Sequence, residues 1–184
     1  RVKGMLKITI PEQELWDEAK EEFVKTKSVN LQLEHSLVSL SKWEAKWHKP
    51  FLGKGDKTVE ETIDYIRCMT ITQNVDPSAY RFIDNDIVQQ VSDYIADPMT
   101  ATWFSKEEKG PPSREVVTAE IVYYWMVTFH IPFECQKWHL NRLLTLIRVC
   151  NAKNTPPKKL NRKQLAKRNT ALNAARRKAL NSKG

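Results

Sequence analysis

Three residues with metal-binding and nucleophilic side chains lie close together in the sequence, at His130, Cys135 and His139. A zinc site needs three or four such ligands, each oriented by a fixed neighbouring group. Pro132 separates His130 from the helix that would carry His139, and the nearest further ligand type is Glu134. The same side chains could form a cysteine–histidine nucleophile, but the sequence offers no group to orient the pair. We interpret the three residues as parts of the turn of a helix hairpin, with a packed thiol and polar histidine caps, and predict no metal, cofactor or catalytic site.

Other sequence patterns typical of catalytic or ligand-binding sites are weak or absent. No glycine-rich phosphate-binding motif occurs, and the chain has only five glycines. The neighbouring carboxylates Asp84 and Asp86, like Glu60 and Glu61, lie where helices are expected to begin, and the helix dipole stabilises acidic groups there. The three cysteines are odd in number and lie in apolar segments, which is typical of reduced thiols in a cytoplasm. The sequence therefore predicts a protein that is not an enzyme.

The distribution of charge is more informative. The chain has 30 Lys and Arg against 22 Asp and Glu, which gives a net charge of +8. The last acidic residue is Glu134, whereas eleven of the basic residues lie in residues 151–184. The excess positive charge thus belongs to the C-terminal segment, while residues 1–150 carry a small negative charge. A localised excess of this kind indicates a binding partner.

The basic segment has a clear boundary and a predicted helix. Pro156 and Pro157 separate it from the preceding sequence. Asn161 can cap a helix that runs from Arg162 to about Leu180, because Ala, Arg, Lys, Leu and Gln all favour helix formation. We therefore predict a basic C-terminal helix or tail over residues 158–184.

Three interpretations of this helix remain open. Leu165, Leu172 and Ala179 recur every seven residues, so the resulting stripe could dock on an acidic protein or on a second copy of the chain. The charges could instead contact nucleic-acid phosphates, or the helix could be a solvated arm. Tryptophans at helical spacing are usually core residues, but exposed ones would suit a protein interface or stack on bases. The candidate partner-binding residues are Trp43, Trp47, Arg162, Leu165, Arg168, Leu172, Arg176 and Arg177.

The rest of the chain predicts a small β element followed by a helical core. Apolar and polar residues alternate in Leu6–Ile10 and Val29–Leu33, and Glu22–Thr26 is a further candidate strand, so residues 1–35 predict a β-meander. From Leu37 the spacing becomes helical, which predicts a core over residues 36–152. The fold class we predict is mainly α: a helical bundle with a small N-terminal β-meander and a basic C-terminal helix.

The boundaries of the core helices follow from local signals. The predictions are a helix from Leu37 that stops at Pro50, a capping box at Thr58–Glu61, a helix opened by Asp84 or Asp86 that stops at Asp97, a central helix from Glu115 to about His130 capped by Ser113, and a second central helix over Gln136–Cys150. Phe104–Pro112 is expected to form a charged loop between the third and fourth of these helices.

The sequence also bears on location. Val116–Phe133 is the longest apolar stretch, but polar residues interrupt it, so it predicts a buried helix rather than a membrane span. The first residues lack the apolar segment of a signal peptide, and Met5 is a candidate native start, with residues 1–4 as an addition.

Several strings along the chain together resemble a family of small proteins of tailed bacteriophages and prophages that is placed among tail-assembly genes. The strings are LQLEHSL (31–37), SKWEAKWHKPFL (41–52), ETIDYIRCMT (61–70), IPFECQKWHLNRLL (131–144) and ALNAARR (171–177). The resemblance implies a tail assembly chaperone without catalytic residues, which binds the tape measure protein in the host cytoplasm. It also leaves open homo-oligomerisation and an alternative role as a virion structural or nucleic-acid-binding protein that uses the basic tail. We expect no membrane partner.

Overall fold

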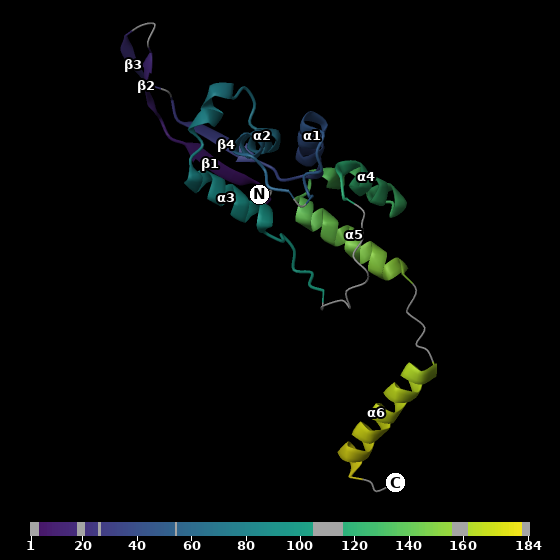
Figure 1. The fold of residues 1–184 in the computed structure, drawn as a ribbon. Coiled ribbons are helices and arrows are strands. Elements are labelled where there is room, and N and C mark those ends of the chain that lie inside the picture. The colour runs from purple at the N-terminus through teal and green to yellow at the C-terminus, as the bar shows by residue number, and fades with distance from the viewer. Residues whose placement is uncertain are drawn as a thin grey trace. The chain divides into compact units, whose positions relative to one another are not determined.

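The computed structural model describes residues 4–17, 21–25, 27–53, 55–104, 116–155 and 162–181. It is mostly helical, with small antiparallel sheets near the N-terminus, which confirms the mainly α prediction (Figure 1). The chain divides into two compact units, residues 1–151 and residues 152–184.

The N-terminal strands form two separate antiparallel pairs. They are β1 (Leu6–Ile10), β2 (Glu14–Asp17), β3 (Glu22–Lys25) and β4 (Val29–Leu33). β1 pairs with β4, with Ile8 opposite Leu31, and β2 pairs with β3. The prediction of a meander is therefore wrong, because β1 pairs with the last strand rather than with its neighbour. The alternating apolar residues of β1 and β4 are buried in the core, whereas β2 and β3 expose the aromatic residues Trp16 and Phe23.

Local signals set the boundaries of the first three α-helices, whereas the fourth and fifth begin elsewhere than predicted. The helices are α1 (Leu37–Trp47), α2 (Val59–Met69), the 3-10 helix η1 (Pro77–Phe82), α3 (Asn85–Ala96), α4 (Ala119–Thr128), the 3-10 helix η2 (Phe133–Lys137), α5 (Leu140–Asn154) and α6 (Arg162–Leu180). The capping box of Thr58 and Glu61 at the start of α2 is confirmed, and Asp84 rather than Asp86 caps α3. The predicted caps Ser113 and Asn161 lie outside the described residues.

The predicted central helix over residues 115–130 is shorter and less buried than expected. Residues 116–118 are not helical, and α4 begins at Ala119 after an extended Thr118. The buried residues of α4 are Ala119, Val122 and Met126, whereas Tyr124 and Val127 are more than half exposed. Although α4 has hydrophobic residues on most sides, it does not lie at the centre of the core.

The second predicted central helix, residues 136–150, is divided in the structure. Trp138 is extended and ends η2, and α5 begins only at Leu140. The break has a tertiary cause, because the backbone N–H of Leu140 donates to the carbonyl of His35 at 2.8 Å and His139 forms a β-bridge with Ser36. These bonds join the start of α5 to the segment between β4 and α1.

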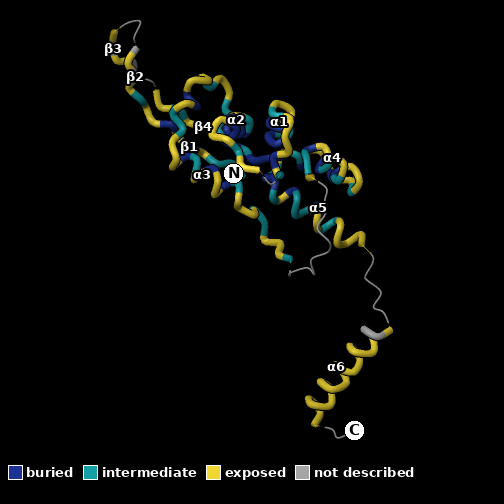
Figure 2. The backbone as a smooth tube through the Cα atoms, viewed as in Figure 1, coloured by how far each residue is buried: buried dark blue, intermediate teal, exposed yellow. Residues whose placement is uncertain are grey.

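The hydrophobic core of residues 1–151 contains residues from β1, β4 and helices α1 to α5. Figure 2 shows the buried residues in this unit, while the described side chains of α6 are exposed along the helix. Burial of each Leu or Ile side chain stabilises the fold by about 1.5–3 kcal/mol. Among the described residues, no helix has the length and hydrophobicity needed to cross a membrane.

Candidate partner-binding helix and buried polar networks

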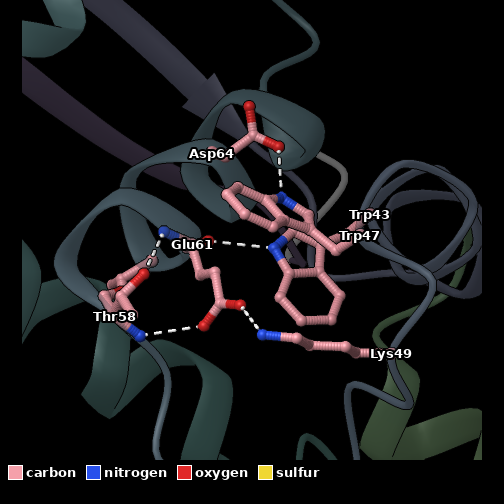
Figure 3. Close-up of polar contacts among 7 residues, drawn as sticks. Trp43, Trp47, Lys49, Thr58, Glu61 and Asp64 are labelled. Carbon is pink, nitrogen blue, oxygen red and sulfur yellow. Dashed lines mark hydrogen bonds and ion pairs between the residues drawn. The ribbon is translucent and has the colours of Figure 1, made fainter.

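The two tryptophans predicted as contact residues join α1 to α2 (Figure 3). The indole of Trp43 donates to the carbonyl of Glu61 at 2.9 Å, and that of Trp47 donates to the carboxylate of Asp64 at 2.9 Å. Trp43 is 1% exposed and Trp47 is half-buried. Trp43 is therefore a core residue that offers no surface to a partner, and Trp47 offers only part of its ring.

The carboxylates in this network are held ionised. Lys49 binds the carboxylate of Glu61, which also accepts the N–H of Thr58, and these contacts lower the pKa of Glu61. Burial opposes ionisation of Asp64, but hydrogen bonds from Lys46 and Trp47 outweigh it and hold the pKa of Asp64 below its usual value. The charges of this network are therefore paired, and the network links α1 to α2.

Glu44 is a buried polar residue that the sequence patterns did not reveal. Its carboxylate accepts the backbone N–H of Phe51 at 2.7 Å and that of Ala119 at 2.7 Å. Thr118 makes no side-chain capping bond, so Glu44 of α1 supplies the acceptor at the start of α4. This long-range cap explains why the helix begins at Ala119.

A second buried network surrounds His35. Its Nδ1 lies 2.7 Å from the hydroxyl of Tyr65, and its backbone N–H donates to the hydroxyl of Tyr94 at 3.3 Å. The ring of His139 packs edge-on against His35 with centroids 5.0 Å apart, and its Nε2 lies 3.0 Å from the carbonyl oxygen of Tyr94. Burial and the nearby His139 lower the pKa of His35 to about 3, and burial also lowers the pKa of His139. Both imidazoles are therefore neutral at pH 7.

The structure does not bring His130, Cys135 and His139 together as one three-ligand group. His130 is exposed, whereas Cys135 and His139 are buried. The ring of His139 packs against the rings of His35 and Tyr94. No group of three potential metal ligands occurs within the described parts of the chain. Burial raises the pKa of the Cys135 thiol, which disfavours the thiolate needed for a nucleophile.

The remaining predicted contact residues lie on α6. Every α6 residue whose side chain is described is exposed, including Leu165 at 46% and Leu172 at 44%. Successive residues of a helix are rotated by about 100°, so Leu165, Leu172 and Ala179 share one side of α6. By the same geometry Arg168 and Arg176 lie on either side of this leucine stripe. The more distant positions are Arg162 and Arg177 on one flank and Lys167 and Lys178 on the opposite side.

Comparison of the chain with family models, with curated proteins and with solved structures gave no match.

Proposed function

We propose that this protein is a non-enzymatic phage morphogenesis protein, a tail assembly chaperone that binds the tape measure protein. In this proposal the folded unit is a helical bundle, α6 is its basic contact element, and the protein acts in the host cytoplasm. The resemblance of the sequence to tail-assembly proteins supplies the biological context.

The observation that carries the proposal is the exposed leucine stripe of α6 between Arg168 and Arg176. Two leucines, each about half exposed on one side of a helix, gain free energy when an apolar partner covers them. Arginines beside such a stripe can bind carboxylates of the partner through paired hydrogen bonds. A partner that fits this surface is an elongated helical protein with apolar side chains and acidic neighbours.

Co-expression with the tape measure protein of the same phage tests the proposal. We expect the two proteins to copurify, and we expect Leu165→Ser with Leu172→Ser to abolish copurification because it removes the apolar stripe. The matched control is Lys167→Ala with Lys178→Ala, which changes the opposite side of α6. A wild-type protein that remains a monomer and does not bind the tape measure protein would refute the function.

The second candidate function is binding of nucleic acid by the basic tail. The observation that favours it is the absence of Asp and Glu from residues 135–184, which contain fourteen Lys and Arg. Binding through phosphates weakens steeply with salt, because each neutralised phosphate releases a counterion. A filter-binding titration against salt decides this: a steep loss of affinity supports nucleic-acid binding, and no binding at low salt excludes it.

A further inference from the structure

The β2–β3 hairpin presents two exposed aromatic rings outside the core. Trp16 and Phe23 are directly opposite each other in the register, and their ring centroids lie 5.1 Å apart in an edge-to-face arrangement. Trp16 is 53% exposed and Phe23 is 67% exposed. Figure 1 shows β2 and β3 extending beyond the end of the β1–β4 pair. Neither ring contributes to the hydrophobic core, so the stability of the fold does not account for this pair.

The charge of the hairpin is opposite to that of α6. Residues 14–25 contain five acidic and two basic residues, whereas residues 162–180 contain seven basic and no acidic residues. One of the hairpin carboxylates, Glu14, is bound by Lys25 at 2.8 Å. The hairpin as a whole therefore remains negative and is complementary in charge to the basic helix α6.

We propose that the aromatic pair of the β2–β3 hairpin docks on the leucine stripe of α6 in a second copy of this chain. Leu165 and Leu172 are separated along the helix axis by about 10 Å, a length that two adjacent aromatic rings cover. Arg168 and Arg176 then lie beside the rings, where an arginine can stack on Trp16 and bind hairpin carboxylates. Trp and Arg are enriched among the few central residues that supply most of the binding energy of an interface.

The contact joins two different surfaces, so it is heterologous and leaves one free hairpin and one free α6 in each dimer. Such contacts continue head to tail and form rings or open chains of copies. A helix of this length and a two-stranded hairpin bury less surface than a standard interface, so association is reversible and depends on concentration. Opposite charges at the contact also make it weaker at high salt.

Complementation between two variants tests this arrangement, with sedimentation velocity of the full chain as the measurement. One variant carries Trp16→Ala and Phe23→Ala and lacks the aromatic pair, and the other carries Leu165→Ser and Leu172→Ser and lacks the stripe. We expect the wild-type chain to associate as its concentration rises. Each variant alone should have a Kd of self-association raised at least about tenfold, so it should stay monomeric at concentrations where the wild type associates. An equimolar mixture should form dimers and stop there, because only one intact hairpin and one intact stripe are able to meet.

Several outcomes would overturn the proposal. A wild-type chain that stays monomeric at all concentrations excludes the contact, and association of the hairpin variant with itself shows pairing of α6 helices instead. A mixture that remains monomeric excludes the heterologous contact. Far-UV circular dichroism checks that both variants are folded, and Trp103→Ala, which removes a ring that is 82% exposed elsewhere, should associate like the wild type.

This self-association is independent of the proposed chaperone function. The self-association can be disproved while the chaperone function stands. The two contacts use the same stripe, but only self-association uses Trp16 and Phe23. The hairpin variant should therefore still copurify with the tape measure protein, whereas the stripe variant should lose both kinds of binding. A wild-type chain that associates with itself but does not bind the tape measure protein would refute the proposed function and leave the contact between copies supported.

Discussion

At the scale of single residues, buried polar side chains hold the helices in register. Glu44 accepts two backbone N–H groups from segments 7 and 75 residues away, and His35 contacts Tyr65 and Tyr94 across the core. In an environment with little water, each unpaired donor or acceptor costs free energy, so these residues specify one arrangement of α1, α2, α3 and α4.

The buried histidines make stability depend on pH. Since the pKa of His35 is about 3 in the folded protein, the unfolded chain binds its proton first as the pH falls below about 6.5. The stability that neutral His35 contributes is therefore present above that pH and is lost on acidification. Between pH 7 and pH 5 we expect the free energy of unfolding to fall by about 2 kcal/mol, measured by urea denaturation.

The lowered pKa of His139 adds a loss of the same sign in this window, so the effect belongs to the buried histidine pair. The lowered pKa values of Glu61 and Asp64 affect stability only below about pH 4.5, so they do not contribute between pH 7 and pH 5. His130→Asn should leave the dependence unchanged, because His130 is exposed and Asn tolerates its left-handed φ of 54°. Equal stability at the two pH values would contradict the role given to His35.

Removal of the Glu44 carboxylate should destabilise the fold. Glu44→Ala leaves the N–H groups of Phe51 and Ala119 without acceptors, and we expect the free energy of unfolding to fall by about 3 kcal/mol. Glu44→Gln keeps one acceptor oxygen and should lie between Ala and the wild type. Lys42→Ala, an exposed change on the same helix, serves as the control in chemical denaturation. A loss for Glu44→Ala no larger than the control's would show that water replaces the carboxylate.

At the scale of elements, locally determined features were predictable and tertiary ones were not. The caps Thr58 and Asp84 act on backbone groups three residues away, so the sequence alone predicts where α2 begins and limits the cap of α3 to Asp84 or Asp86. The start of α4 depends on Glu44, 75 residues away, and the start of α5 depends on the carbonyl of His35. The pairing of β1 with β4 likewise depends on which strands can bury an apolar face, which no local window shows.

The same distinction applies to the candidate contact residues. Helical spacing predicts the leucine stripe of α6 because a single helix determines it. The same spacing did not reveal that Trp43 is 1% exposed, because its burial depends on the packing of α1 against α2. The exposed Trp16 and Phe23 were not selected as contact residues from the sequence. Their position in the segment between the core strands β1 and β4 could have suggested that they are exposed.

The sides of α6 should differ in their effect on binding. Arg168→Ala with Arg176→Ala and Lys167→Ala with Lys178→Ala remove equal charge, and Ala favours the helix in both. A protein partner on the leucine stripe is expected to bind the first variant at least about tenfold more weakly and the second nearly normally. Equilibrium binding to the tape measure protein measures the difference. Equal losses for both variants would indicate a diffuse electrostatic contact such as that with nucleic acid.

At the scale of the whole molecule, packing and charge belong to different parts of the chain. The buried core ends at Ile147, within the first compact unit. Ten of the thirty Lys and Arg follow residue 155, and every acidic residue precedes residue 135. The chain thus combines a folded, slightly acidic unit with a basic helix whose described side chains are exposed.

Deletion of residues 156–184 should separate stability from binding. The shortened chain keeps all buried core residues, so we expect its free energy of unfolding to match that of the full chain to within about 0.5 kcal/mol in urea denaturation. It retains twenty basic and twenty-two acidic residues and loses the leucine stripe. It should therefore bind neither the tape measure protein nor nucleic acid, and it should not associate with itself. Continued copurification with the tape measure protein would move the contact surface from α6 to the folded unit, where Tyr124 and Val127 of α4 are the exposed apolar residues to change next.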